Sequence, residues 1–310
     1  MLIQLLQMTL PVLVTFCLGY AIKRFNLISL AGMQGLKALV SKITLPVVLF
    51  NAFLTANYSG TIFLTFALVF ISCVLGLCAG FALRKLASPH EKYLPFLVTN
   101  FEGGMLGYAL FGLLFPGETA TFALFDIGQT FCAFTVFLVT LKAANGERST
   151  PMGVVKNMAT NPVFIGCMLG ALLGLLGVGN YMTSTDVGII FSNIISFISA
   201  PTSAVILLIV GYDLSFEKSC MRPVFTTLAL RVGIMALLLM AGAGILFMII
   251  PFSKPVFIAM LLAYSLPAPY IIPLFMNSKE SEGYVSTTLS LQTLLSILFF
   301  MGISFYTLMS

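Results

Sequence analysis

The stretch YLPFLVTNFEGGMLGYALFGLL, residues 93–114, decides how the rest of the chain is interpreted. It is apolar and long enough to cross a membrane, yet Glu102 lies near its middle, with Asn100 two residues before it and Gly103 and Gly104 directly after it. A charged side chain at bilayer depth is costly and usually marks a path for an ion or a substrate. Glycines let the helix unwind locally, which membranes tolerate only around a protein-lined cavity. The stretch therefore indicates a broken transmembrane helix of a transporter.

The composition is that of a multi-span membrane protein. Hydrophobic residues make up 59% of the 310 and charged residues 8%, whereas a soluble domain carries roughly 25% charged residues. We expect no removable signal peptide, because Met1 leads directly into apolar sequence and the first positive charges follow that segment. The net charge of +5 is then a topology signal, and no nucleic-acid partner is expected. Six cysteines without C-x-x-C spacing and a single histidine predict no disulfide framework, metal site or cofactor.

Apolar segments long enough to cross the hydrocarbon core contain about 20 residues. We predict ten such spans at roughly 3–22, 38–56, 61–83, 93–115, 119–141, 160–177, 187–211, 224–250, 255–277 and 285–309. The sequence therefore predicts an all-α membrane protein with ten transmembrane helices.

Positive charges are confined to alternate connections between these segments. Counting Arg231 just inside the eighth segment, fourteen of the 15 basic residues fall on one side, and the other side holds only Lys254. Because Lys and Arg concentrate in cytoplasmic loops, we place the basic side in the cytoplasm. Both termini are then extracellular or periplasmic, and the membrane is the plasma membrane. A missed or additional span would disrupt the alternation, so the charges support ten spans independently of hydropathy.

The chain divides into two halves of five segments each. We expect a first repeat at 1–141, a cytoplasmic linker at 142–160 and a second repeat at 161–310. An odd number of spans per half inverts the second half relative to the first. A short T-x-P-V match at 9–12 and 160–163 relates the two halves. Inverted repeats with paired broken helices are typical of secondary transporters whose binding site lies near the midplane.

Segment 255–277 contains the second expected break. Its prolines at 267, 269 and 273 remove three backbone donors and clash with preceding carbonyls. A break exposes N–H groups that suit an anion and carbonyls that suit a cation. We expect this break to cross the one at Gly103 and Gly104 and to hold a small carboxylate with a coupling ion. The alternative is a kinked helix without a site.

Four polar residues are candidates for ion coupling. Glu102 could carry a proton or ligate a cation, and the alternative is a protonated carboxyl with a structural role. Asp126, Gln129 and Thr130 lie at i, i+3 and i+4, so they share one helix face. Asp126 either faces an outer vestibule or lies near the membrane interface. Both H⁺ and Na⁺ remain open as the coupling ion, with Glu102 as the place for a Na⁺.

Three other polar side chains lie in or beside the spans. Arg231 is the only basic residue able to reach a carboxylate from inside a span, but we expect it to extend to the cytoplasmic surface. Asn51 and Asn100 could bind a substrate without a large desolvation cost. Hydrogen bonding between helices is the alternative for both asparagines.

Several short motifs occur in a particular order over nearly the whole chain. They are Leu18-Gly19-Tyr20, Leu45-Pro46 with Leu49-Phe50 and Ala52, Asn100 with Gly103, Gly104 and Gly107, Asn161-Pro162, Ala200-Pro201 with Gly211 and Leu214, and the prolines of 255–277. No single motif is specific, but their order and the 5+5 layout resemble the auxin efflux carrier family. That family includes the plant PIN auxin carriers and bacterial permeases described as malonate transporters.

The resemblance implies an inverted-repeat fold shared with sodium–bile acid symporters. The first, second, sixth and seventh segments would form a scaffold, and the others a transport domain that moves against it as an elevator. The crossing of broken helices four and nine would hold an organic carboxylate, and a homodimer through the scaffold would fit such carriers. The substrate-binding residues it implies are Asn51, Asn100, Gly103, Gly104, Pro267, Ala268, Pro269 and Tyr270. Glu102 is more acidic than the usual residue there, and 61–83 has no acidic residue.

We therefore expect a secondary active transporter of a small organic carboxylate such as malonate or an auxin-like acid. The alternative on the same fold is a sodium-coupled symporter of a larger amphipathic anion. A membrane enzyme is not expected, because the sequence has no G-x-S-x-G or H-E-x-x-H motif and no aspartate-rich pair.

Overall fold

The computed structural model describes residues 2–56, 60–146, 150–276 and 279–309, and within these ranges the chain forms helices and connecting segments without a strand. Residues 147–149 of the expected linker lie outside the described residues. In chain order the elements are α1 (Leu2–Phe25), α2 (Leu30–Leu39), η1 (Val40–Thr44), α3 (Leu45–Leu54), α4 (Gly60–Leu83), η2 (Arg84–Ala87), α5 (Leu94–Leu97), η3 (Gly103–Gly107), α6 (Tyr108–Leu114), α7 (Thr119–Cys132), η4 (Ala133–Phe137), α8 (Leu138–Ala144), α9 (Pro151–Thr160), α10 (Pro162–Leu175), α11 (Val178–Ser184), α12 (Asp186–Ser199), α13 (Thr202–Tyr212), η5 (Lys218–Cys220), α14 (Met221–Ile249), α15 (Lys254–Ser265), η6 (Ile272–Phe275), η7 (Lys279–Ser281) and α16 (Glu282–Met309).

The described helices include several that are long and apolar enough to cross a membrane. Seven meet this description: Ile3–Phe25, Leu30–Leu54, Ile62–Ala87, Thr119–Ala144, Asp186–Tyr212, Lys218–Ile249 and Glu282–Met309. The pair α9 and α10, bent by 82°, would make an eighth. The remaining apolar segments are interrupted, and their longest helical stretches are Gly103–Leu114 and Lys254–Ser265. The chain is therefore an all-helical, multi-pass membrane protein.

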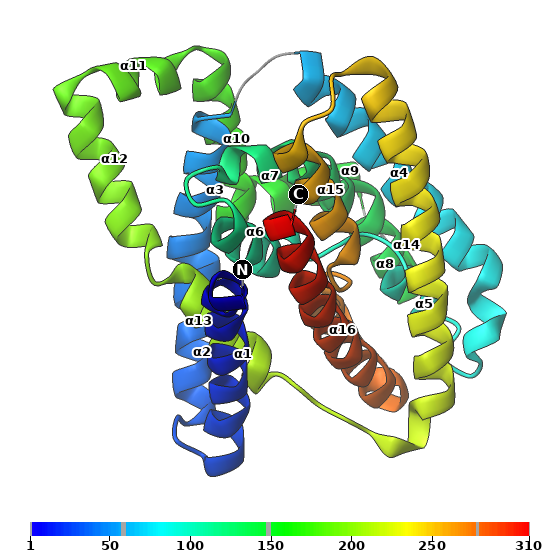
Figure 1. Cartoon of the computed structure of the whole chain (residues 1–310). Coiled ribbons are helices and arrows are strands. Elements are labelled where there is room, and N and C mark those ends of the chain that lie inside the picture. The colour runs from blue at the N-terminus through cyan, green and yellow to red at the C-terminus, as the bar shows by residue number, and fades with distance from the viewer. Residues whose placement is uncertain (1, 57–59, 147–149, 277–278, 310) are drawn as a thin grey trace.

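Two pairs of helices pack at very short range. In the first pair, α1 lies against α13, and a Cβ on Gly19 would collide with the carbonyl of Leu208. In the second, α3 lies against α10, and a Cβ on Gly166 would come within 2.5 Å of the carbonyl of Pro46. Because these glycines lack side chains, the helix backbones touch, as is common between membrane helices. Figure 1 shows these pairs, together with α12, on one side of the molecule.

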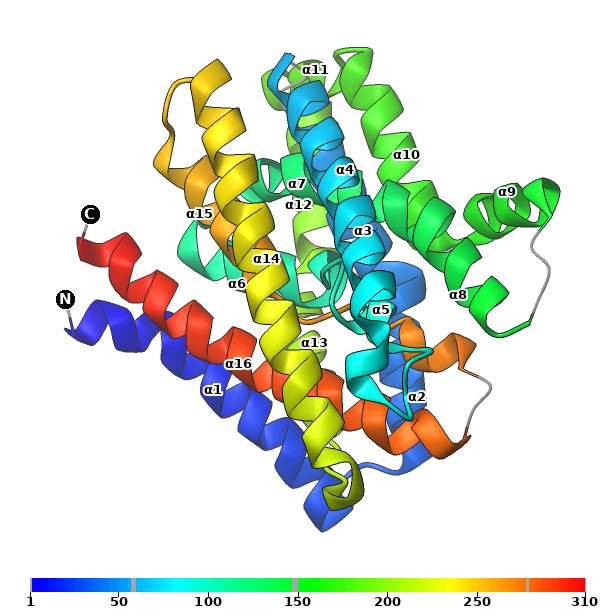
Figure 2. The ribbon, with the colours of Figure 1, turned by 90° about the vertical axis from the view of Figure 1, so that its right-hand side faces the viewer.

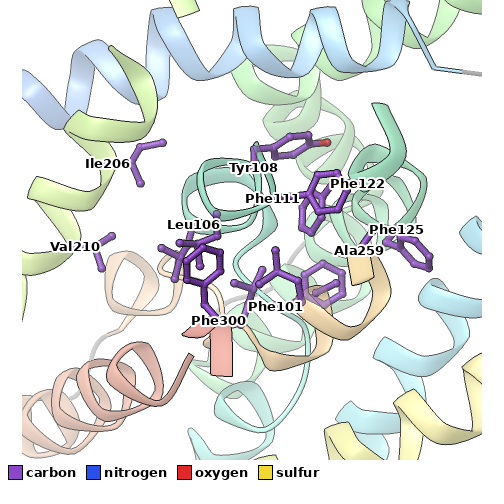
Figure 3. Close-up of a cluster of buried hydrophobic side chains, with 14 of the residues drawn as sticks. Phe101, Leu106, Tyr108, Phe111, Phe122, Phe125, Ile206, Val210, Ala259 and Phe300 are labelled. Atoms are coloured by element: carbon purple, nitrogen blue, oxygen red, sulfur yellow. The ribbon is translucent and has the colours of Figure 1, made fainter. Parts of the chain in front are cut away.

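The other side of the molecule is built from α4, α7, α14, α15 and α16, which pack on one another (Figure 1). Buried aromatic side chains fill its interior, and the ring centroids of Phe111 and Phe122 are 5.6 Å apart (Figure 3). Helix α1 also contacts α16, which joins the two sides, as the view in Figure 2 makes visible. The residues of the two interruptions, 98–102 and 266–271, are buried or half-buried, so their polar backbone is enclosed by protein, as a membrane requires.

The helices differ locally from the expected spans. The second span begins earlier than expected, because α2, η1 and α3 run together from Leu30 to Leu54. Part of the expected linker forms α9, and Asn161 then caps α10 by accepting hydrogen bonds from Val163 N and Phe164 N. Helix α9 consequently projects sideways from α10 (Figure 2). The two T-x-P-V motifs differ in structure, since Pro11 lies inside α1 whereas Pro162 begins α10 after the bend.

Candidate functional site

Both segments in which a break was expected are interrupted. Helix α5 ends at Leu97, and no regular helix forms until η3 begins at Gly103. Asn100 adopts a left-handed conformation with φ of 49°, which asparagine tolerates better than most residues. Helix α15 ends at Ser265, and η6 begins only at Ile272, after the proline-rich turn. The prediction of two interrupted segments is confirmed, but the first interruption precedes Gly103 and Gly104, which begin η3. We call residues 98–102 and 266–271 together the junction.

The two halves of the junction are joined through Glu102. Its backbone N–H donates to Pro267 O at 2.9 Å. Its carboxylate accepts a hydrogen bond from Met105 N at 3.2 Å through Oε1 and one from Tyr270 N at 2.7 Å through Oε2. One carboxylate thus accepts backbone N–H groups from both interrupted segments, which is the environment that a helix N-terminus offers an anion.

Arg231 joins the same segments through their carbonyl groups. Its Nη1 donates to Leu97 O and Thr99 O, both at 3.1 Å. Its Nη2 donates to Asn100 O and Leu266 O, both at 2.7 Å. The residue is only 4% exposed, so the expectation that it extends to the cytoplasmic surface is wrong. The physical reason is that the interruptions leave carbonyls without helical donors, and the guanidinium fork satisfies four of them.

Gln292 on α16 adds two hydrogen bonds to the junction. Its Oε1 accepts from Ala268 N and its Nε2 donates to Leu97 O, both at 2.9 Å. One turn later, Ser296 Oγ donates to Ser265 O at 2.6 Å. Sequence reasoning missed these two residues. Their i, i+4 spacing was the available signal, because such a pair faces one side of a helix, but neighbouring serines and threonines on the same segment obscure it.

The residues expected to couple an ion lie directly behind the junction. Asp126 is 1% exposed, and a Cβ on Gly103 would collide with its Oδ1. Gln129 Nε2 donates to Phe101 O, and the hydroxyls of Tyr108 and Thr130 lie beside the Asp126 carboxyl group. Asp126 is therefore enclosed by protein next to Gly103, and its depth in the membrane stays a prediction. Glu102, Asp126, Gln129 and Thr130 therefore come together.

Two cavities adjoin the junction next to α13, and a third, of about 340 Å³ and mostly apolar, is lined by Arg231, Leu266 and Gln292. The first, of about 360 Å³, is lined by Asn51 and Gly104 together with Tyr108, Ser199 and Thr202. The second, of about 430 Å³, is lined by Met105 and Tyr270 together with Lys37, Asp213 and Ser290. Both cavities are lined by the same two stretches of helix. On α2–α3 the second cavity uses residues 37 and 41 and the first uses residues 45–51, and on α12–α13 the first uses residues 195–206 and the second uses residues 209–213. The cavities therefore lie at successive levels along these helices.

An apolar layer and a surface ion pair lie close to these cavities. The layer consists of Leu106, Ile206 and Val210, which are 0%, 1% and 5% exposed, and Figure 3 shows Ile206 and Val210 beside the segment that carries Leu106. On the wall of the second cavity, Lys37 Nζ and Asp213 Oδ1 are 2.6 Å apart.

The structure divides the expected substrate-binding residues into two groups. Asn51 and Gly104 line the first cavity and Tyr270 the second. The other group is buried in the packed interior of the junction and consists of Asn100, Gly103, Pro267, Ala268 and Pro269. Asn100 meets Arg231 through its backbone carbonyl. The residues of the second group therefore shape the junction, and those of the first group are the ones that face open space.

The fold and the junction together define a class: a multi-pass helical membrane protein with two interrupted segments in its interior, held together by Glu102 and Arg231. No protein-family model matches the chain, and no curated protein is significantly similar to it.

Proposed function

We propose that the protein is a secondary active transporter that moves a small organic carboxylate, such as malonate or an auxin-like acid, across the plasma membrane. The observation that carries this proposal is the meeting of two interrupted segments between two cavities. In known transporters, broken helices of this kind form the substrate site near the midplane. A membership of the auxin efflux carrier family is part of the proposal, on the sequence motifs given above.

The proposed architecture is a 5+5 inverted repeat of ten spans with both termini outside. Segment 1 packs on segment 7 as α1 on α13, and segment 2 packs on segment 6 as α3 on α10. In a 5+5 repeat, segment 1 corresponds to segment 6 and segment 2 to segment 7. Exchanging the two halves therefore turns the contact of segments 1 and 7 into the contact of segments 6 and 2. This relation supports a two-fold axis between the halves, and the glycines at both contacts support it further.

In this proposal the first, second, sixth and seventh spans are the scaffold, which could also form a homodimer, and the others move as an elevator. Opposite cavities give the substrate alternating access, with the layer of Leu106, Ile206 and Val210 closing the path between them. Asn51, Gly104 and Tyr270 contact the carboxylate, and the remaining junction residues hold the unwound backbone in position. Glu102, Asp126, Gln129 and Thr130 act in coupling.

Purified protein in liposomes tests this function. Labelled malonate, other dicarboxylates and an aromatic acetate are offered under imposed H⁺ or Na⁺ gradients. We expect saturable uptake of at least one of these acids above that of empty liposomes. Glu102→Ala should abolish the uptake or uncouple it from the driving gradient. Normal, still coupled uptake in that variant would remove Glu102 from the mechanism, and chemical conversion of the acids without flux would favour an enzyme.

A further inference from the structure

The carbonyl side of the junction is already occupied by a cation. Four carbonyl oxygens, those of Leu97, Thr99, Asn100 and Leu266, converge on the guanidinium of Arg231 at 2.7–3.1 Å. They come from both interrupted segments, at the points where α5 and α15 have just ended. Carbonyls at the C-terminal ends of half-helices are the groups that coordinate a coupling Na⁺ in transporters with broken helices.

The amide side of the junction is occupied in the same way by an anion. Glu102 accepts the N–H groups of Met105 and Tyr270, one from each interrupted segment. The junction therefore contains one protein cation at its carbonyls and one protein anion at its amides. With both sets of backbone dipoles satisfied by side chains, no additional inorganic cation is needed to balance Glu102 or to hold the carbonyls.

Arginine suits this position for a chemical reason. Its planar guanidinium presents several N–H donors in a fixed fork, so one group can reach acceptors on two segments at once. It also stays charged over the physiological pH range. A bound Na⁺ would have to displace this fork from the same oxygen atoms, and the tethered side chain is always present at the site.

We propose that Arg231 is the resident cation of the junction, in the place that a coupling Na⁺ would take, so that transport proceeds without Na⁺. The consequence for transport rests on the function proposed above, whereas the occupancy of the carbonyls by Arg231 does not. Arg231 is a positioning residue, because its hydrogen bonds go to the backbone carbonyls that form the site. An arginine that only stabilised the fold would not affect which ion the protein binds, whereas a resident cation does.

The first experiment measures thermal unfolding of the purified protein in NaCl, KCl and choline chloride at equal ionic strength. We expect the Tm of the wild type to be the same in all three salts. Arg231→Ala should lower the Tm in choline, because the carbonyls of Thr99, Asn100 and Leu266 lose their donor while Leu97 O keeps only Gln292 Nε2. Its Tm should then rise with Na⁺ relative to choline, and also with low concentrations of methylguanidinium, since both ions can enter the vacated position.

Arg222→Ala is the matched control, because Arg222 is an exposed arginine on the same helix. We expect it to leave the Tm and the salt response unchanged. If Arg231→Ala does not fold, Arg231→Lys replaces it, since a single ammonium reaches fewer of the four carbonyls and should give a smaller loss of Tm. A rise in the Tm of the wild type that is specific to Na⁺ would overturn the proposal, whichever variants fold.

The second experiment measures malonate uptake into liposomes in the same salts. Equal uptake by the wild type in Na⁺ and in choline supports the proposal, and uptake that requires Na⁺ overturns it. If no carboxylate is transported while the three Tm results hold, the proposed function fails and the assignment of Arg231 as resident cation stands.

Discussion

Glu102 and Arg231 show how single side chains make an interrupted membrane segment possible. Unwinding a helix in lipid leaves N–H and C=O groups without partners, and each costs several kcal/mol if it stays so. Glu102 accepts two of the N–H groups and Arg231 donates to four carbonyls. The sequence shows Glu102 inside the first interrupted segment. Arg231, which donates to the carbonyls, lies more than 120 residues further along the chain, so the sequence does not show that the two belong to one site.

Glu102→Gln tests the amide side at this scale. The neutral side chain keeps its size, but it cannot exchange a proton, and its NH₂ group cannot accept the hydrogen bond of Tyr270 N. We expect uptake to fall at least about tenfold, because a hydrogen bond to a charged group contributes roughly 1.5–3 kcal/mol. The remaining uptake should not respond to an imposed pH gradient. Glu118→Gln, at an exposed carboxylate, is the control and should behave as the wild type.

His90 lies in a connection outside the membrane segments, and it makes the free energy of unfolding depend on pH. Its Nδ1 lies 3.2 Å from Ser281 Oγ, and its ring stacks on Tyr284 with centroids 4.6 Å apart. Partial burial lowers the pKa of His90 below its usual value, although Glu280 and Glu217 oppose the shift. Because the folded state binds the proton less readily, the stabilisation is complete above about pH 6.5 and is lost as the pH falls toward the folded pKa.

We therefore expect the Tm of the wild type to fall more steeply than that of His90→Gln between about pH 7.5 and pH 5. The effect should be small, since much of the ring is open to solvent and its charge is screened. Thermal unfolding at closely spaced pH values checks this expectation. Parallel pH profiles for the two proteins would show that His90 does not contribute to the pH dependence.

At the scale of elements, the interruptions could be predicted and several helix boundaries could not. Prolines at 267 and 269 stop a helix for local reasons, so their effect is visible in the sequence, whereas Gly103 and Gly104 begin η3 and the interruption precedes them. The 82° bend between α9 and α10 depends on capping by Asn161. The short helix α11 lies in the connection between the expected spans 160–177 and 187–211. The burial of Arg231 could not be predicted, because the carbonyl oxygens that accept its hydrogen bonds come from segments distant in the sequence.

Gly103 is the glycine at which a small change should have a large effect. A Cβ at this position would collide with Asp126 Oδ1, a buried atom that has little room to move. Gly103→Ala should therefore lower the Tm and the rate of uptake together. Gly112→Ala is the control on α6, since no atom lies within 4 Å of its added Cβ. Alanine also favours a helix over glycine by up to about 1 kcal/mol, so that variant should be as stable as the wild type or more stable. Equal behaviour of the two variants would contradict the close contact at Gly103.

At the scale of the whole molecule, the orientation in the membrane remains a prediction from charge. Single cysteines in place of Glu118 and Ser88, both exposed, are suitable probes in a variant without the native cysteines. A maleimide that cannot cross membranes should label position 118 in intact cells and position 88 only after permeabilisation, because the basic connections face the cytoplasm. Labelling with the opposite pattern would invert the topology, and labelling of both positions in intact cells would contradict the number of spans between them.

The contact of α1 with α13 and that of α3 with α10 also constrain how the chain is made. When the ribosome has released only residues 1–141, the surfaces of α1 and α3 that form these contacts still face lipid, since their partners belong to the later part of the chain. Assembly must therefore wait for synthesis of the second half. A gene cut between the halves should yield fragments that are degraded when expressed singly and that persist when they are expressed together.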